Sequence, residues 1–466
     1  MRFTKIVCTI GPVTSSVPAV KKLISCGMDV ARLNFSHGTV GEHEERIRII
    51  RKASSELGLE TGILQDLPGP KMRVGRIIGE PVRLVRGRTV VLTTRRLNGN
   101  SETIPVLYRD FPRAVREGSA VYLADGTIRL KVSKVEEDEV VCSVELGGLL
   151  ASGKGVNVPS VSSDVDAVTE EDASYIEFGA KQGIDFVAVS FVRSGRDVER
   201  ARKLVNQYNG TAQIVAKIEK REAVENFKEI VSASDCVMVA RGDLGVELGI
   251  ENVPMAQKKI IAEANRQGKP VITATQILLS MLSDPTPTRA EVSDIANAII
   301  DGSDALMLSE ETAVGKYYAE AVTVLSRVAQ TVEKELEYTP KPVISAESTE
   351  EAVGTAACSV AHAVGAKFIL AYTRSGSTAR QVARHRPRIP IRALTVDKRV
   401  IRQLKLVCGV EPYHNPRNVG ALDSETVERH VKRLGLVKKG ELIVVVAGSP
   451  TGPAGSTNML RVQKMG

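Results

Sequence analysis

Several short apolar segments of the sequence end in polar side chains that could handle phosphate groups. Arg32, Asn34 and Ser36 alternate with apolar residues, so they would share one face of a strand. Lys217 and Glu219 share a face in another segment. A lysine can neutralise a phosphate, and a carboxylate can hold a divalent cation. The alternative in both segments is a structural ion pair, because an unpaired buried charge is costly.

Three further segments end in groups of the same kind. Gly242 and Asp243 follow an apolar strand, where a glycine allows close backbone approach and a following helix could hold an anion. Asp243 could be a helix cap, or it could be a second metal ligand beside Glu219. Thr275 ends a strand in a hydroxyl group, although threonine is common in strands for structural reasons. Asp66 ends the segment that precedes a change of pattern.

The elements that must position these residues alternate between apolar strands and amphipathic helices. Strands are expected at 5–11, 29–36 and 62–67, and then at 186–192, 213–219, 236–240, 271–275 and 305–308. Three βα units before an interruption and five after it make eight. The pattern therefore predicts a TIM (β/α)8 barrel with its site at the carboxyl ends of the strands. A doubly wound parallel sheet is the competing interpretation, because periodicity alone does not separate the two folds.

The interruption and the end of the chain predict two more domains. Residues 70–159 carry only short strands joined by glycine and polar turns, which is typical of a small β-barrel. A proline-containing linker at 338–342 precedes a third α/β region. We therefore expect a catalytic barrel at 1–69 and 160–337, an inserted β-barrel lid after strand 3 at 70–159, and a C-terminal α/β regulatory domain at 338–466.

Composition limits the class of protein. The chain has 466 residues, of which 43% are hydrophobic and 25% charged, and this excludes disordered, fibrous and polytopic membrane proteins. The net charge of +8 suggests a nucleic-acid-binding alternative, but the insertion offers few aromatic side chains for stacking on bases. The six cysteines form no C-x-x-C pair, and no segment reads as a membrane span or a signal peptide, so we expect a cytoplasmic protein.

Three common nucleotide-binding and metal-binding motifs are absent from the sequence. It contains no G-x-x-x-x-G-K-[ST], H-E-x-x-H or G-x-G-x-x-G motif, so it is not a P-loop enzyme. Two cations, three acids, a hydroxyl and a helix N-terminus at one barrel mouth nevertheless suit phosphoryl transfer, in which cations and a metal hold the phosphate oxygens in line.

Taken together, these segments closely resemble the pyruvate kinase family. The resemblance lies in 31–38, 216–219, 240–245, 273–276, 287–291 and 307–313, and 154–159 is similar to the end of that family's inserted domain. Order and spacing agree from the N-terminus to about residue 336, and the remainder is similar in layout. The resemblance implies the last step of glycolysis: phosphoenolpyruvate, ADP and a proton give pyruvate and ATP. It also implies Mg²⁺ or Mn²⁺, a homotetramer, and no nucleic-acid or membrane partner.

The resemblance assigns a role to each group at the mouth. Lys217 would stabilise the phosphoryl group in transfer and the developing enolate, and Arg32 would bind the phosphate. Backbone N–H groups of Gly242 and Asp243, with Thr275, would take the substrate carboxylate. Thr275 would also relay a proton to the enolate carbon through water.

The resemblance also implies a metal site and a nucleotide site. Glu219 and Asp243 would hold the divalent ion. The nucleotide phosphates would contact Asn34, His37, Arg73 and Lys154. Because Lys154 lies in the insertion, the insertion would act as a lid that excludes water. Another metal-dependent barrel enzyme acting on phosphoenolpyruvate, such as a lyase, would not need Arg73 and Lys154.

One position departs from the family pattern. Many members bind K⁺ through residues that match Asn34, Ser36, Asp66 and the carbonyl of Leu67, and they carry an acid where this chain has Lys71. We expect the ammonium group of Lys71 to supply the charge that K⁺ supplies elsewhere, so that activity does not require K⁺.

A second phosphate site is expected in the C-terminal region. Glycine and hydroxyl side chains follow a strand there and open a helix, which is typical of a phosphate cradle but also of an ordinary capped turn. The family places a phosphorylated metabolite effector at the corresponding turn. The residues are Thr373, Arg374, Ser375, Gly376, Ser377 and Thr378.

Overall fold

Eight parallel strands close into a barrel at the centre of the chain. The computed structural model describes residues 2–124, 126–159, 166–337, 348–415, 423–448 and 457–466. The strands follow the order β1-β16-β15-β14-β13-β12-β3-β2 around the ring. Their bounds are β1 (Lys5–Thr9), β2 (Val30–Asn34), β3 (Gly62–Asp66), β12 (Phe186–Val189), β13 (Gln213–Ile218), β14 (Cys236–Ala240), β15 (Val271–Ala274) and β16 (Ala305–Leu308). The closed ring confirms the predicted TIM barrel and excludes the doubly wound sheet.

The barrel strands are largely apolar on both faces because helices cover the outside and side chains fill the inside. The interior includes Val7, Leu64, Phe186, Val215 and Met238, all fully buried. Several strands end earlier than the sequence predicts, because polar residues such as Glu219 and Thr275 lie just beyond the sheet. These residues are therefore placed at the barrel mouth.

Some of the outer helices begin at side-chain caps. Thr39 caps α2 with Glu42, and Thr288 caps α9 with Glu291, each in a capping box. The helices around the barrel are α1 (Val17–Cys26), α2 (Val40–Glu56), α3 (Glu170–Lys181), α4 (Gly195–Gln207), α5 (Arg221–Glu225), α6 (Phe227–Ala233), α7 (Arg241–Leu248), α8 (Val253–Arg266), α9 (Arg289–Asp301), α10 (Glu310–Ala313) and α11 (Tyr318–Glu335).

The chain between β3 and β12 forms a separate β structure. A six-stranded sheet has the order β11-β7-β8-β9-β5-β6, and β4 pairs with β10. The two sheet edges are joined through the segment near Val74, whose N–H donates to the carbonyl of Lys154 on one side, while Gly75 donates to Pro105 on the other. This joining gives the barrel-like form expected of the insertion. The strands are β4 (Val82–Leu84), β5 (Thr89–Thr93), β6 (Thr103–Pro105), β7 (Ala120–Leu123), β8 (Ile128–Val135), β9 (Glu139–Leu146), β10 (Gly148–Leu150) and β11 (Val156–Asn157).

The C-terminal region is a five-stranded sheet with helices. Four strands are parallel and β21 is antiparallel, in the order β19-β18-β17-β20-β21. The strands are β17 (Ile369–Tyr372), β18 (Ile391–Thr395), β19 (Val410–His414), β20 (Leu442–Gly448) and β21 (Thr457–Lys464), and the helices are α12 (Thr349–Ala363), α13 (Ser377–Ala383), α14 (Lys398–Leu404) and α15 (Ser424–Leu434). The sequence pattern predicts strands at 368–372, 391–396 and 442–447, which correspond to β17, β18 and β20. It does not predict β19 and β21, whose residues are mostly half-buried or exposed and carry no long apolar run.

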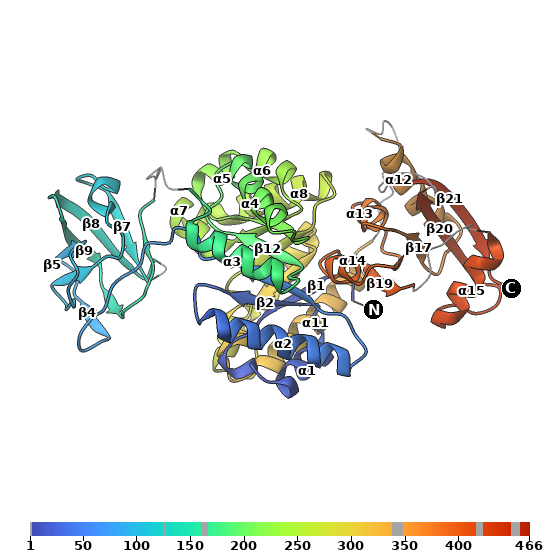
Figure 1. The fold of residues 1–466 in the computed structure, drawn as a ribbon, viewed down its shortest axis with the longest axis horizontal. Coiled ribbons are helices and arrows are strands. Elements are labelled where there is room, and N and C mark those ends of the chain that lie inside the picture. The colour runs from blue at the N-terminus through green and yellow to red at the C-terminus, as the bar shows by residue number, and fades with distance from the viewer. Residues whose placement is uncertain (1, 125, 160–165, 338–347, 416–422, 449–456) are drawn as a thin grey trace.

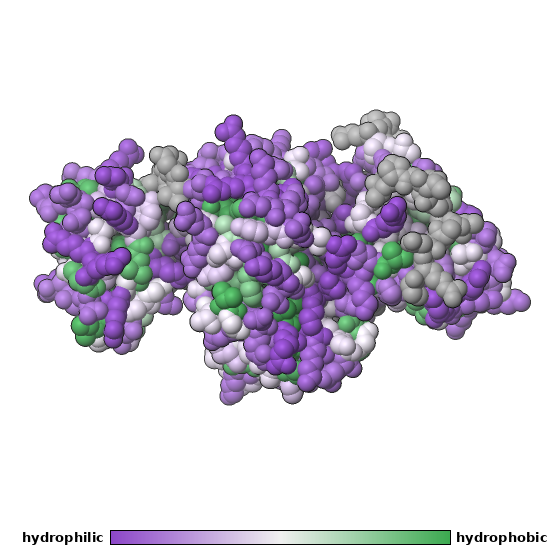
Figure 2. Space-filling view, viewed as in Figure 1, coloured by the Kyte–Doolittle hydropathy of each residue, from purple (hydrophilic) through white to green (hydrophobic). Residues whose placement is uncertain are grey.

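The insertion and the C-terminal region lie at opposite ends of the barrel (Figure 1). Hydrophilic residues cover most of the face shown in Figure 2, and its hydrophobic patches are small and separate. No helix in the described part of the chain is long and apolar enough to span a membrane. The expected domain boundaries at 69/70, 159/160 and 337/338 stay predictions, and the linker at 338–342 lies outside the described residues.

Candidate active site

The carboxyl ends of β2, β3 and β13 bring four charged side chains together at the barrel mouth. The Nε atom of Arg32 lies 2.7 Å from Oδ2 of Asp66, and Nζ of Lys217 lies 3.1 Å from Oδ1 of the same carboxylate. Lys217 also lies 2.8 Å from Oε1 of Glu219. The structural ion pairs considered from the sequence are therefore present. They form one chain of alternating charge rather than separate pairs.

The two kinds of charge in this chain are buried to different depths. The side chains of Asp66 and Glu219 are 1% exposed, whereas those of Arg32 and Lys217 are 11% exposed. The cations therefore retain access to solvent while the carboxylates that compensate them do not. This arrangement can receive an anion without first creating an unpaired buried charge.

Opposing effects set the pKa values in the cluster. Burial lowers the pKa of Lys217, but Asp66 and Glu219 raise it, and the net shift is upward. Burial raises the pKa of Asp66, but Lys217 and Arg32 lower it, and the net shift is downward. Lys217 and Asp66 are therefore both charged at neutral pH.

Ser190 is a member of the cluster that sequence reasoning missed. Its Oγ accepts a hydrogen bond from Nζ of Lys217 at 2.6 Å and donates to the carbonyl of Leu67 at 2.7 Å. The residue follows β12 directly, so it obeys the same rule as the other polar residues at strand ends. The sequence predicts a strand at 186–192, which places Ser190 inside the strand and not at its polar end. Thr9 was also missed, and its hydroxyl accepts from Nη1 of Arg32 at 3.0 Å.

Thr275 is held in a backbone conformation that β-branched residues rarely adopt. Its φ angle is +72°, and that of Gln276 is +53°. The guanidinium group of Arg241 donates to the carbonyls of Ala274 and Thr275 at 3.2 and 2.7 Å and holds the turn in place. The Oγ1 atom of Thr275 accepts from the N–H of Gly242 at 2.9 Å. The structure thus brings Thr275 and the start of α7 together, as the sequence predicts.

Glu219 and Asp243 supply the carboxylates that a divalent cation would need. Burial raises the pKa of Glu219; Asp243 adds to this rise and Lys217 opposes it. The Oδ1 atom of the nearby Asn157 is buried and has no hydrogen-bond partner. No group of three or more histidine, cysteine, aspartate or glutamate side chains that could hold a metal occurs among the described residues. Two carboxylates completed by substrate oxygens suit Mg²⁺, so this donor set fits the ion.

The residues matched to the monovalent cation site have partners within the protein. The N–H of Ser36 donates to Oδ1 of Asn34 at 3.2 Å, and the Leu67 carbonyl is bound by Ser190. Asp66 carries both Arg32 and Lys217. Lys71 contacts Asp243, with Nζ 3.5 Å from Oδ1.

Two of the residues expected to meet a nucleotide, Arg73 and Lys154, act on a third, His37, through their positive charges. Burial lowers the pKa of His37, and Arg73, Arg32, Lys71 and Lys154 lower it further. Arg73 also donates to the carbonyl of Gly153, beside Lys154, at 3.0 Å. The insertion therefore brings positive charge to the side of the mouth where His37 lies.

The turn at 373–378 is closed by its own hydrogen bonds. Thr373 accepts from the N–H of Gly376 at 2.9 Å, and Thr378 lies 2.9 Å from the hydroxyl of Thr457. Both threonines are buried, while Arg374 and Ser375 are exposed and Ser377 is half-buried. The exposed groups are therefore the ones available to an anion.

Comparison with known proteins assigns the family. The family model described as "Pyruvate kinase, barrel domain" matches residues 1–322, and "Pyruvate kinase, alpha/beta domain" matches residues 351–463. The chain belongs to the pyruvate kinase family. A pyruvate kinase from Thermococcus litoralis is 43% identical over 98% of both chains. One from Clostridium acetobutylicum is 41% identical over 99% of both, and one from Bacillus licheniformis is 44% identical over all of this chain and 81% of the relative.

Membership of the pyruvate kinase family confirms the resemblance found in the sequence motifs. The family is one of phosphotransferases, which agrees with the cations and carboxylates gathered at the mouth. The nucleic-acid-binding alternative loses its support, because both matched domains are those of pyruvate kinases.

Proposed function

We propose that the chain catalyses the transfer of the phosphoryl group of phosphoenolpyruvate to ADP, which gives pyruvate and ATP. The observation that carries the proposal is the buried chain Arg32-Asp66-Lys217-Glu219 at the mouth of a pyruvate kinase barrel. The carboxylates of Asp66 and Glu219 compensate the charges of Arg32 and Lys217, and both cations remain accessible to solvent. Such preorganised charges stabilise a transferring phosphoryl group without having to reorganise during the reaction.

Arg32 and Lys217 would bind the phosphoryl group from the substrate side. Lys217 would also stabilise the enolate that forms when the group leaves. Ser190 and Asp66 fix the position of the ammonium group, so the side chain of Lys217 loses little conformational entropy when substrate binds. Arg32 is fixed by Asp66 and Thr9 in the same way.

The start of α7 would bind the carboxylate of the substrate. The N–H of Gly242 now donates to Thr275, and a substrate carboxylate would replace this acceptor with help from the N–H of Asp243. The released hydroxyl of Thr275 would then be free to pass a proton, through water, to the enolate carbon. The strained backbone of Thr275 keeps the hydroxyl at this position.

Glu219 and Asp243 would hold a divalent ion, which supplies positive charge to the phosphoryl oxygens when it is bound. Asn34, His37, Arg73 and Lys154 would contact the phosphates of the nucleotide. The insertion would then close over the mouth as a lid. Arg374 with Ser375 and Ser377 would bind a phosphorylated effector. A homotetramer, a cytoplasmic location and independence of K⁺ complete the proposal.

A coupled assay tests the proposed reaction. Pyruvate formation from phosphoenolpyruvate is measured with and without ADP, and with and without Mg²⁺ or Mn²⁺. We expect pyruvate only when both ADP and the metal are present. Pyruvate formed without ADP would indicate a lyase or a phosphatase instead.

A further inference from the structure

Four aspartates fasten the barrel strands in pairs on the face opposite the mouth. The aspartates directly precede β2, β12, β14 and β16. The carboxylate of each one accepts a hydrogen bond from a backbone N–H at the start of the barrel strand that comes before it in the sequence. Each is also bound by arginine. The sets are Asp29 with Ile6 (2.9 Å) and Arg2, Asp185 with Ile63 (2.9 Å), Arg51 and Arg402, Asp235 with Ile214 (2.8 Å) and Arg202, and Asp304 with Val271 (3.1 Å) and Arg386.

The second of these pairs, β3 with β12, differs from the others in its connection. Asp185 and Ile63 are 122 residues apart, because the whole insertion lies between the two strands. The corresponding separations are 23, 21 and 33 residues for the other pairs. A short βα connection limits the register of its two strands, whereas a long excursion does so far less. The register of β3 against β12 therefore depends more on direct contacts.

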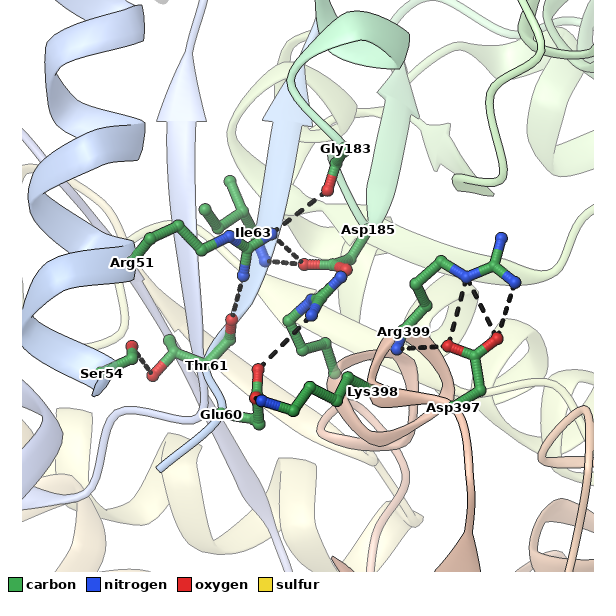
Figure 3. A network of polar contacts seen from close by, with 11 residues as sticks. Arg51, Ser54, Glu60, Thr61, Ile63, Gly183, Asp185, Asp397, Lys398 and Arg399 are labelled. Carbon is green, nitrogen blue, oxygen red and sulfur yellow. Dashed lines mark hydrogen bonds and ion pairs between the residues drawn. The ribbon is translucent and has the colours of Figure 1, made fainter. Parts of the chain in front are cut away.

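Asp185 supplies such contacts through both its backbone and its side chain. Its N–H donates to the carbonyl of Ile63 at 3.1 Å, and its Oδ2 accepts from the N–H of the same residue. Arg51 of α2 binds Oδ2 at 3.0 Å, and Nε of Arg402 binds Oδ1 at 2.7 Å. Figure 3 shows Asp185 at the centre of this network, between Arg51 and the C-terminal segment. The side chain of Asp185 is 1% exposed, so removing a cation weakens the compensation of a buried charge.

Arg402 reaches this network from α14 of the C-terminal region. Its Nη1 also lies 3.4 Å from Glu60, which Lys398 of the same helix contacts at 3.3 Å. Glu60 precedes β3 by two residues. The C-terminal region thus contacts the residues that precede both β3 and β12, the strands on either side of the insertion.

The opposite ends of β3 and β12 carry two partners of Lys217. Asp66 ends β3, Ser190 follows β12, and both contact Nζ of Lys217. The hydroxyl of Ser190 also donates to Leu67 and joins the two strand ends. A shift of one strand along the other would move one of these partners relative to the ammonium group.

We propose that Asp185 and Arg402 are positioning residues for the reaction, which hold β3 and β12 in register and thereby set Asp66 and Ser190 around Lys217. The proposal rests on the proposed function, in which Lys217 stabilises the transferring group. The C-terminal region then contributes to turnover by a contact at the far end of the barrel, with no effector bound.

The test uses the full chain with Arg402→Leu, and Arg399→Leu as the matched control. Arg399 lies on the same helix but pairs with Asp397 of its own region. Turnover and KM are measured at least about 10 °C below the unfolding midpoint of each variant, so that lost stability does not lower the rate. We expect Arg402→Leu to lower kcat about 3- to 10-fold, with KM for ADP changed less than about twofold. Arg399→Leu should match the parent chain.

A double-mutant cycle separates positioning from stability alone. Ser190→Ala is combined with Arg402→Leu, and the proposal expects the combined loss in kcat to be smaller than the product of the single losses. Multiplicative losses, or a lowered unfolding midpoint with unchanged kcat, would overturn it. Arg402→Lys, which keeps the cation, replaces Arg402→Leu in the cycle if the latter does not fold, and the same criterion applies. An inactive parent chain would contradict the proposed function, whereas an active parent with multiplicative losses contradicts this inference alone.

Discussion

The Nζ atom of Lys71 lies 3.5 Å from Oδ1 of Asp243, so a cation at the start of the expected insertion meets a carboxylate of the barrel mouth. Both side chains are about one-fifth exposed, at 20% and 22%. The contact fixes a positive charge beside the residues that would hold metal and substrate. It gives the departure from the family pattern at position 71 a physical location.

Lys71 should make turnover independent of monovalent cations. If the covalently attached ammonium group supplies the charge, as proposed, removing K⁺ and Na⁺ from the buffer should leave kcat nearly unchanged. Lys71→Glu places an acid at this position, as the expected family pattern does, and should introduce a requirement for K⁺. Turnover is measured across a K⁺ titration for both chains. Losing one electrostatic donor costs about 10²-fold or more in kcat, so a loss of more than about tenfold in the parent chain without K⁺ would contradict this role of Lys71.

Lys217→Met should abolish most of the turnover while the fold survives. The variant removes the cation between Asp66 and Glu219, and the expected loss in kcat is about 10²- to 10³-fold, the scale of one electrostatic donor. Lys203→Met, the same change on an exposed position of α4, serves as the control. Near-normal turnover of Lys217→Met would contradict the role assigned to Lys217.

Thr275 should show a conflict between stability and activity. Thr275→Gly relieves the positive φ angle but loses the hydroxyl, whereas Thr275→Ala loses the hydroxyl and keeps the strained backbone. Thr275→Gly should therefore be more stable than Thr275→Ala by about 1 kcal/mol, and both should lose turnover. Thr275→Ser keeps the hydroxyl and should retain most of the turnover. Equal stability of the glycine and alanine variants would argue against backbone strain.

His43 should make the fold sensitive to acid. The ring is 1% exposed, stacks on Phe35 with centroids 3.9 Å apart, and its Nε2 lies 3.0 Å from the carbonyl of His37. Burial, with a smaller contribution from Arg46, lowers its pKa from 6.5 to about 4. Below pH 6.5 the unfolded chain binds a proton that the folded chain does not. Stability is therefore present above pH 6.5 and is lost as the pH falls towards 4, by about 3 kcal/mol in all.

Urea unfolding at about pH 7.5 and about pH 5 measures this effect. His43→Leu should remove about 2 kcal/mol of the difference between the two conditions. His414→Leu, at an exposed position, should leave the difference as it is in the parent chain. An unchanged difference in His43→Leu would show that another group carries the acid sensitivity.

Arg374 should be needed for binding of a phosphorylated metabolite. It is the exposed cation of the turn at 373–378, where the buried threonines already have partners. Calorimetry with sugar phosphates should show binding to the parent chain and to Arg327→Ala, an exposed arginine of α11, but weakened or lost binding to Arg374→Ala. Identical binding to all three would count against the site.

The barrel could be predicted because its strands are short apolar runs at regular spacing, and their polar ends mark the mouth. Ser190 escaped prediction because its role depends on Lys217 and Leu67, which are distant in sequence. The ion-pair partner of Arg32 could not be predicted for the same reason, because the sequence contains several acidic residues that could pair with it. Only the closed ring brings Asp66 beneath it.

The aspartates below the barrel left a signal in the sequence that periodicity did not use. Asp29, Asp185, Asp235 and Asp304 each stand directly before an apolar strand, where a charge is unexpected. A search for an aspartate directly before each apolar strand would have identified all four of these residues. Two of the arginines that bind them, Arg386 and Arg402, could not have been assigned, because they come from the C-terminal region and meet the barrel only in the folded chain.

The hydrogen bond between Asp185 and Ile63 also bears on how the chain can be altered. It joins the two strands on either side of the insertion without using any residue of the insertion itself. The barrel therefore consists of four βα-βα modules, and in each of them an aspartate joins the two strands by a hydrogen bond. One of the modules accommodates the insertion between its strands. An insertion of another length or origin could be grafted at this junction, or new chain termini opened within it, while the two strands stay joined. The insertion can thus be exchanged without breaking the hydrogen bond that joins β3 to β12.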